Sequence, residues 1–312
     1  MSTLLTRCAL VLSVWQRSPV IVRAVIAGFA VALGGILPWA GTAGHPGLAG
    51  WNARVFVQVP WAIPPAALYL WLYWRYLGGA GWPRSTSQSR RANLRANRLS
   101  GEVWGMSLLA GFIGLATLLP LVRIMSRLVT LPMEAQRIVA PPQMPLATIV
   151  LLLIMGAILS GVIEEAAFRG YMQGLIERRH GPIVAILVNG IVFGVLHYSH
   201  HPRSVLAMLP YYMAVAAVYG GLAYATNSIL PGMVLHAGGD VFSLARLWRT
   251  GLPEWQVAAS SPALVWQTGV DAAFVRPVVV FCVLSAAAVW AYSALARAAR
   301  GARCPPAGSQ SV

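Results

Sequence analysis

Residues 146–165 read LATIVLLLIMGAILSGVIEE, an apolar run that ends on two adjacent glutamates, Glu164 and Glu165. The run has no charged side chain before Glu164, and it is long enough to cross the hydrocarbon core of a bilayer as a helix. A surface helix of a soluble protein has one polar face, and this stretch has none. It therefore predicts a membrane-spanning helix that carries two carboxylates.

The composition of the whole chain extends this prediction to an all-α, polytopic membrane protein. Hydrophobic residues make up 58% of the 312 residues and charged residues only 10%, whereas an average soluble domain is about one-quarter charged. The mean hydropathy of +0.67 also excludes a disordered chain. The apolar runs predict a bundle of about eight transmembrane helices, at residues 20–42, 55–77, 103–122, 145–166, 182–198, 204–226, 228–247 and 270–296.

The charge balance is strongly basic, with a formal net charge of +15, and all 23 basic residues are arginine. Because the arginines flank apolar runs and no nucleic-acid-binding motif is visible, we expect contact with anionic lipid and not with nucleic acid. With eight spans, fourteen arginines fall on the side of both termini and the 78–102 loop, and eight on the other side. The positive-inside rule then places both termini in the cytoplasm and the chain in the cell (inner) membrane.

The chain divides into three parts. Residues 1–144 contain the N-terminal spans and the arginine-rich loop, residues 145–247 the core with the unusual polar residues, and residues 248–312 an outer loop, the last span and a cytoplasmic tail. The three cysteines, Cys8, Cys282 and Cys304, have no CxxC spacing. They predict neither a disulfide framework nor a cysteine zinc site.

A first cluster of ionisable residues, at membrane depth, reads Glu164-Glu165-Ala166-Ala167-Phe168-Arg169. On a helix Glu165 and Arg169 are four residues apart and can pair, whereas Glu164 points about 100° away. Glu164 can then face a cavity and act as a general base. The alternative is a surface ion pair at a helix end, which such an apolar run makes the weaker interpretation.

Two further clusters are Phe193-Gly194-Val195-Leu196-His197 and His236-Ala237-Gly238-Gly239-Asp240. Phe193 lies one turn before His197 and can pack near its imidazole. His236 and Asp240 share a helical face, and the small residues between them allow another helix or a substrate backbone to approach closely. Taken singly, each histidine is explained as well by an interhelical hydrogen bond as by catalysis.

The spacing of the clusters predicts that they meet. The stretch Arg178-Arg179-His180-Gly181-Pro182 is a helix stop and restart, midway between Glu164 and His197. If the chain turns there, both residues stand roughly 25 Å from the tip of a helical hairpin and face one another. We expect His236 to reach the same depth from a third helix.

A glutamate, two histidines and an aspartate at membrane depth can hydrolyse an amide in two ways. They can hold a divalent metal, most suitably zinc, with ligands drawn from Glu164, His197, His236 and Asp240. Alternatively, Glu164 deprotonates water directly while histidine and Asp240 polarise the carbonyl or steer the oxyanion. No HExxH, GxSxG, Walker A or GxGxxG motif points to another chemistry.

In this order, the motifs EExxxR, FxxxH and HxxxN/D resemble those of the CPBP family of intramembrane proteases, which includes type II CAAX prenyl endopeptidases and bacteriocin-processing or self-immunity proteins. The resemblance covers residues 145 to about 247. It implies an endopeptidase of membrane-associated proteins or peptides, with Glu164 activating water, His197 and His236 as catalytic or metal-site histidines, and Asp240 at the asparagine-or-aspartate position. An aspartate adds a negative charge, which favours a metal. The resemblance gives a supporting role to Glu165, Arg169 and Phe193.

Two other functions stay open. Intramembrane glutamate, histidine and aspartate also form proton relays, so a proton-coupled transporter is the second candidate, although the chain shows no related halves. The third is a catalytically inactive immunity or interaction protein on the same scaffold. We interpret His200 and His201 as loop residues and not as an extra metal site. The aromatic residues between Met208 and Tyr224 are interpreted as packing against helices or lipid.

Overall fold

The structure is a computed structural model that describes residues 15, 17–42, 44–131, 138, 140–197, 205–252, 256 and 261–303. Its described part is helical apart from one antiparallel pair of two-residue strands, β1 (Gly41–Thr42) and β2 (His45–Pro46). The prediction of an all-α polytopic membrane protein is confirmed. The predictions for Cys8, His200, His201 and Cys304 fall outside the described residues.

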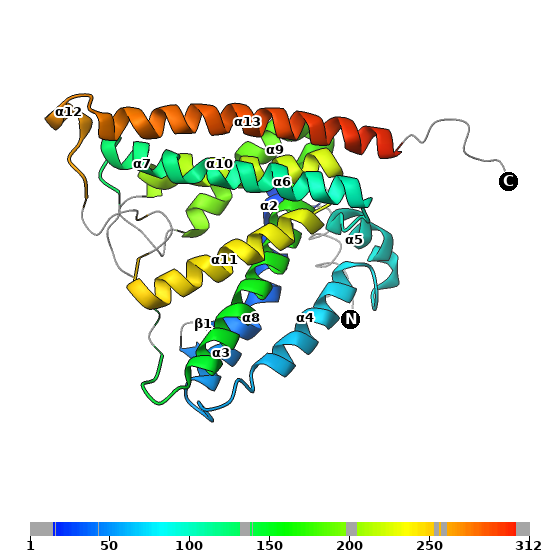
Figure 1. Ribbon diagram of the computed structural model, residues 1–312. Coiled ribbons are helices and arrows are strands. Elements are labelled where there is room, and N and C mark those ends of the chain that lie inside the picture. Colours follow the sequence, from blue (N-terminus) through cyan, green and yellow to red (C-terminus); the bar gives the residue numbers. More distant parts are fainter. Residues whose placement is uncertain are drawn as a thin grey trace.

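Helices occupy all eight predicted positions (Figure 1). They are joined by short additional helices, and their bounds are α2 (Val20–Ala40), α3 (Leu48–Asn52), α4 (Ile63–Leu77), η1 (Arg84–Thr86), α5 (Ser87–Leu94), α6 (Gly101–Ala116), α7 (Leu118–Leu128), α8 (Leu146–Glu164), η2 (Glu165–Gln173), α9 (Gly174–Leu196), α10 (Val205–Thr226), α11 (Leu230–Thr250), α12 (Val265–Thr268) and α13 (Ala272–Arg303).

Among the described residues, five stretches are long and apolar enough to cross a membrane, at 20–40, 101–128, 146–196, 206–226 and 272–302. The predicted spans at 55–77 and 228–247 become α4 and α11, which do not meet that measure. α4 has only 15 residues, and α11 carries Asp240 together with two arginines. The stretch 146–196 contains two predicted spans in one run.

This run, α8–η2–α9, turns back on itself at Gly181. Gly181 has φ 82°, a backbone conformation that favours glycine, and Pro182 follows it at the restart of the helix. Beyond the turn, Asn189 donates a hydrogen bond of 2.8 Å to the carbonyl of Phe168, and the rings of Phe168 and Phe193 lie 5.2 Å apart. The two arms are therefore antiparallel, and the predicted hairpin is confirmed.

Helix α11 crosses the first arm of the hairpin at close range. A Cβ on Gly161 of α8 would lie 2.6 Å from the backbone nitrogen of Ala237 on α11, so only glycine allows this approach. Gly161 is one turn before the glutamate pair and Ala237 follows His236. The crossing thus brings the cluster that begins at Glu164 next to the cluster that begins at His236. Around this pair, α10 packs on α9, η2 packs on α2, and α13 packs on α6 and α7 (Figure 1).

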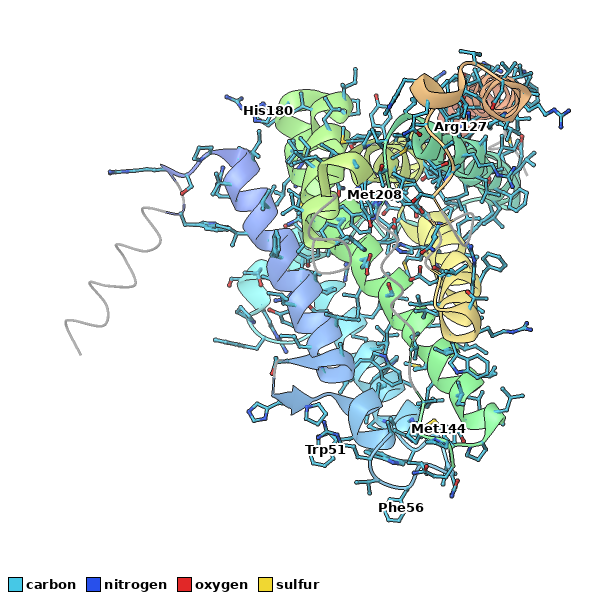
Figure 2. The ribbon with its side chains drawn as sticks, turned by 90° about the vertical axis from the view of Figure 1, so that its left-hand side faces the viewer. Trp51, Phe56, Arg127, Met144, His180 and Met208 are labelled. Atoms are coloured by element: carbon cyan, nitrogen blue, oxygen red, sulfur yellow. The ribbon has the colours of Figure 1, made fainter. Side chains whose placement is uncertain are left out.

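The loop between α4 and α6, the hairpin turn and the α10–α11 connection lie at one end of the bundle, where Leu99 and Val103 pack with Leu295 and Ala299 of α13. The 78–102 loop, the hairpin turn and the described C-terminal part of α13, which the sequence assigned to one side, are therefore neighbours. Figure 2 shows Trp51, Phe56 and Met144 at the end of the molecule opposite His180. The assignment of the arginine-rich end to the cytoplasm stays a prediction.

Candidate active site

One cavity of about 490 Å³ contains the four residues predicted for the site, Glu164, His197, His236 and Asp240. Glu164 is the last residue of α8, His197 directly follows α9, and the other two lie on α11. The four predicted residues therefore face one cavity, and a direct approach of His197 to the other three stays a prediction. Their roles in a reaction stay a prediction.

The two adjacent glutamates point to different surroundings. Glu165 is fully buried, and its Oε1 lies 3.1 Å from Nη1 of Arg169. The side chain of Glu164 is 24% exposed and lines the cavity, and its Oε1 accepts a hydrogen bond of 2.9 Å from Ser160 Oγ. One carboxylate is thus held by a counter-ion, as predicted, while the other is available to a substrate.

Arg169 is a fully buried guanidinium on η2, a π-helix of nine residues that begins at Glu165. Its guanidinium carbon lies 5.2 Å from the ring centre of Phe193 and 5.0 Å from that of Tyr219. A buried cation needs compensation, and here one carboxylate and two aromatic faces provide it. The widened helical turn is a local feature that often accompanies functional sites.

The imidazole of His236 is fixed from two sides. Its Nδ1 lies 2.9 Å from Glu165 Oε1, and because a carboxylate accepts hydrogen bonds, Nδ1 carries the hydrogen. Its ring stacks on Tyr219 at 5.0 Å. On the preceding turn, a Cβ on Gly232 would lie 2.7 Å from Glu165 Oε2. The glycine therefore lets Glu165 reach His236.

The other ring nitrogen of His236 faces the cavity. Its Nε2 lies 3.7 Å from Glu164 Oε2 and 3.7 Å from Asp240 Oδ2. Both distances exceed those of a hydrogen bond. The predicted placement of His236 and Asp240 on one helical face is confirmed, and Nε2 stands between two carboxylates.

The imidazole of His197 is held by a hydrogen bond to a backbone carbonyl and by two aromatic rings. Its Nδ1 lies 2.8 Å from the carbonyl oxygen of Phe193, which can only accept, so Nδ1 donates and Nε2 is the acceptor of the neutral ring. The ring lies 4.5 Å from Phe193 and 4.8 Å from Tyr212. The predicted contact between Phe193 and His197 is confirmed.

The donors around the cavity have the chemistry of a zinc site, namely two imidazoles and two carboxylates. Glu165 on His236 Nδ1 is also the kind of outer partner that orients a ligand histidine. Within the described ranges, however, no three histidine, cysteine, aspartate or glutamate side chains are placed to share one metal ion. The zinc site therefore stays a prediction.

Several residues of the site were not indicated by the sequence. Tyr212 and Tyr219 lie in the segment interpreted as packing, and they do pack, but against the two imidazoles. Ser160 stands four residues before Glu164, a helical spacing that could have suggested the contact. The contact between Glu165 and His236 had no such signal, since 71 residues separate the two.

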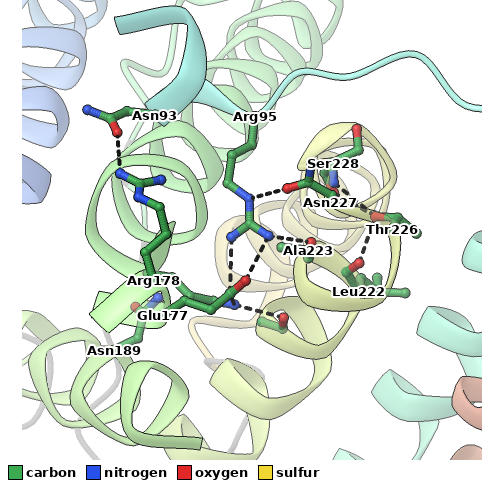
Figure 3. A network of polar contacts seen from close by, with 12 residues as sticks. Asn93, Arg95, Glu177, Arg178, Asn189, Leu222, Ala223, Thr226, Asn227 and Ser228 are labelled. Atoms are coloured by element: carbon green, nitrogen blue, oxygen red, sulfur yellow. Dashed lines mark hydrogen bonds and ion pairs between the residues drawn. The ribbon is translucent and has the colours of Figure 1, made fainter. Parts of the chain in front are cut away.

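A second polar network lies at the hairpin end and does not line the cavity (Figure 3). Arg95 is 5% exposed. Its guanidinium donates to both carboxylate oxygens of Glu177, at 3.1 and 3.2 Å, to the carbonyl of Ala223 at 2.9 Å and to Asn227 Oδ1 at 3.2 Å. Gln173 also donates to Glu177. We call these residues the Arg95 clamp, which joins the loop before α6 to the hairpin and to the end of α10.

Comparison with protein families matches residues 146–242 to the family described as type II CAAX prenyl endopeptidase Rce1-like. The matched segment begins with α8 and contains all three motifs. No curated protein and no solved structure matches the chain. The resemblance that the motifs predicted is thus confirmed for the segment that forms most of the cavity: residues 146–242 are similar to the Rce1-like type II CAAX prenyl endopeptidases of the CPBP family.

Proposed function

We propose that this protein is an intramembrane endopeptidase that hydrolyses a peptide bond of a membrane-associated protein or peptide. The observation that supports the proposal is the single cavity in which Glu164, His197, His236 and Asp240 meet among apolar helices. Ionisable groups at membrane depth are costly and mark reaction sites or pathways. The match of residues 146–242 supports a protease over a transporter.

The first step is the activation of water by Glu164. The carboxylate accepts one proton of the water, and Nε2 of His197 accepts a hydrogen bond from its second O–H. The two acceptors leave the oxygen lone pair directed at the peptide carbonyl carbon, where the new C–O bond forms. The hydrogen bond from Ser160 to Glu164 Oε1 holds the carboxylate in place.

The second step is the stabilisation and collapse of the tetrahedral intermediate. His236, with Nδ1 donating to Glu165, presents Nε2–H to the carbonyl oxygen on which negative charge develops. Asp240 stabilises the positively charged form of this ring from 3.7 Å. The C–N bond then breaks, and the proton held by Glu164 passes to the departing amine, which restores the carboxylate.

Glu164→Gln is the decisive variant, because glutamine keeps the size and the hydrogen bond to Ser160 but cannot take a proton. We expect the cleavage rate to fall by about 10²–10⁴-fold, with an unchanged melting temperature. The assay presents a library of membrane-anchored fluorogenic peptides to the protein in liposomes. Full cleavage by Glu164→Gln would rule out this mechanism.

Glu102→Gln is the matched control, since Glu102 is exposed at the start of α6, and it should cleave normally. The same preparation tests the predicted metal by elemental analysis and by adding a chelator. About one zinc per chain, with cleavage lost on chelation, would place an ion among the four side chains. A folded wild-type protein that cleaves nothing would favour the inactive interaction protein.

A further inference from the structure

The cavity follows one face of α11 for a considerable length. Most of the residues of this helix that line it recur every three or four positions, namely His236, Gly239, Asp240, Ser243, Leu244 and Leu247, and Phe242 lines it as well. From His236 to Leu247 the helix rises by roughly 16 Å. An extended peptide advances about 3.3 Å per residue, so this face offers room for about five substrate residues in a row.

Other helices line the cavity beside this face. Gly111 of α6 packs against Leu235, and Leu115 and Leu118 follow further along the chain and line the same cavity. Residues of α8 and α10 line it as well, among them Ser160 and Tyr219. We call the part of the cavity that follows α11 the trench, and the reacting groups lie near one end of it.

Gly239 lies on the floor of this trench, beside the reacting groups. It is exposed, and no atom of the protein lies within 4 Å of the place where its Cβ would be. Gly161 and Gly232 differ, because a Cβ on either would collide with the protein itself. Gly239 lines the cavity together with His236 and Asp240, so the empty space at its Cβ position is next to the reacting groups.

We propose that Gly239 is the specificity-determining residue at which the substrate backbone passes the reaction centre, with the substrate lying extended along α11. This inference rests on the proposed endopeptidase activity and deepens it. A side chain at position 239 would fill the space through which the scissile carbonyl reaches Glu164 and His236. The cost would fall on substrate binding and not on the stability of the fold.

The test compares Gly239→Ala and Gly239→Leu with Gly238→Leu. Gly238 is also exposed, with no atom within 4 Å of its Cβ position, but it does not line the cavity. We expect KM to rise roughly tenfold in Gly239→Ala and cleavage to be lost in Gly239→Leu. The melting temperature should stay the same or rise, since glycine is a poor helix former. Gly238→Leu should cleave at the wild-type rate.

A photo-crosslinking residue at position 239, combined with Glu164→Gln, adds a readout that does not depend on turnover. It should capture the peptide substrate, whereas the same residue at position 238 should not. Wild-type kcat/KM in Gly239→Leu, or equal crosslinking at both positions, would overturn the inference. A folded wild-type protein that cleaves none of the peptides would instead overturn the endopeptidase itself, so the two failures are distinguishable.

Discussion

Two arginine–glutamate pairs lie inside this bundle, and they differ in how their charges are satisfied. In the Arg95 clamp, the guanidinium bonds to a carboxylate, a backbone carbonyl and a side-chain amide (Figure 3). Beside the cavity, Arg169 makes its ion pair with Glu165, but none of its three nitrogens has a partner in good hydrogen-bond geometry among the described residues. All three guanidinium nitrogens of Arg95 thus donate hydrogen bonds, whereas the guanidinium of Arg169 is under-satisfied.

The difference shows that buried charge alone does not identify a reaction site. The guanidinium of Arg95 is well satisfied, and the clamp residues do not line the cavity, so we interpret the clamp as holding the hairpin against α10. The pair beside the cavity is less well satisfied, yet it holds the imidazole of His236 at 2.9 Å. Natural proteins keep such incompletely satisfied groups where function requires them. We therefore expect substitutions in the two networks to have different effects on stability and on cleavage.

The largest effect is expected for Glu165→Gln. The change removes the counter-ion of Arg169 and the anionic acceptor of His236 Nδ1–H at once. We expect cleavage to fall by about 10²-fold or more and the folded state to lose about 3–5 kcal/mol, because Arg169 is left as a buried uncompensated charge. Steady-state kinetics in liposomes and thermal unfolding in detergent measure the two effects.

A double variant separates the effect of Glu165 on stability from its effect on cleavage. Glu165→Gln with Arg169→Met removes both charges, so it should regain much of the stability while cleavage stays low. A single Glu165→Gln variant with wild-type kcat would show that Glu165 does not position His236. In that case the pair of Glu165 and Arg169 would have no role in cleavage that the Arg95 clamp lacks.

The next effect is expected for Arg95→Met, and it should appear in stability and not in catalysis. The loss of the guanidinium leaves Glu177 without its counter-ion, with only the hydrogen bond from Gln173, and removes the donor to Ala223 and Asn227. This loss costs about 3 kcal/mol. The molecules that remain folded should cleave within a few-fold of the wild-type rate, because the clamp touches none of the reacting groups. Arg91→Met, at an exposed arginine of α5, is the control. A fall in kcat as large as that of Glu165→Gln would contradict this assignment.

The elements of this site that the sequence predicted are the local ones. Glu165 and Arg169 pair because helical geometry alone places residues four apart on one face, and the turn at Gly181 follows from glycine and proline chemistry. These relations do not depend on how helices pack.

The elements that the sequence did not predict depend on the angle and depth at which helices cross. Glu165 reaches His236 only because Gly161 and Gly232 allow α8 and α11 to approach. Arg95 bonds to residues 82 to 132 positions away, at an end of the bundle where loops and turns meet. No period in the sequence encodes such contacts, and the π-helical turn after Glu164 likewise has no sequence signature that we could read.

The smallest effect is expected for a third ion pair, between Arg127 at the end of the 101–128 stretch and Asp271, which lies just before α13 and outside the five membrane-spanning stretches. Its oxygen–nitrogen distance is 3.0 Å, and Asp271 is 42% exposed. The hydrogen bond from Arg127 lowers the pKa of the Asp271 carboxyl below its ordinary value of 3.8. Since the folded pKa lies below the unfolded one, the pair stabilises the fold above about pH 4 and loses this contribution as the pH falls.

Asp271→Asn should therefore melt slightly below the wild type at pH 7, and the two curves should converge towards pH 3. Unfolding in detergent over this pH range measures the difference, and cleavage at neutral pH should not change. Because water screens an exposed pair, the loss should be clearly smaller than in Arg95→Met. An equal loss would mean that burial is not what separates the three pairs, and the contrast between the Arg95 clamp and the cavity would then need another cause.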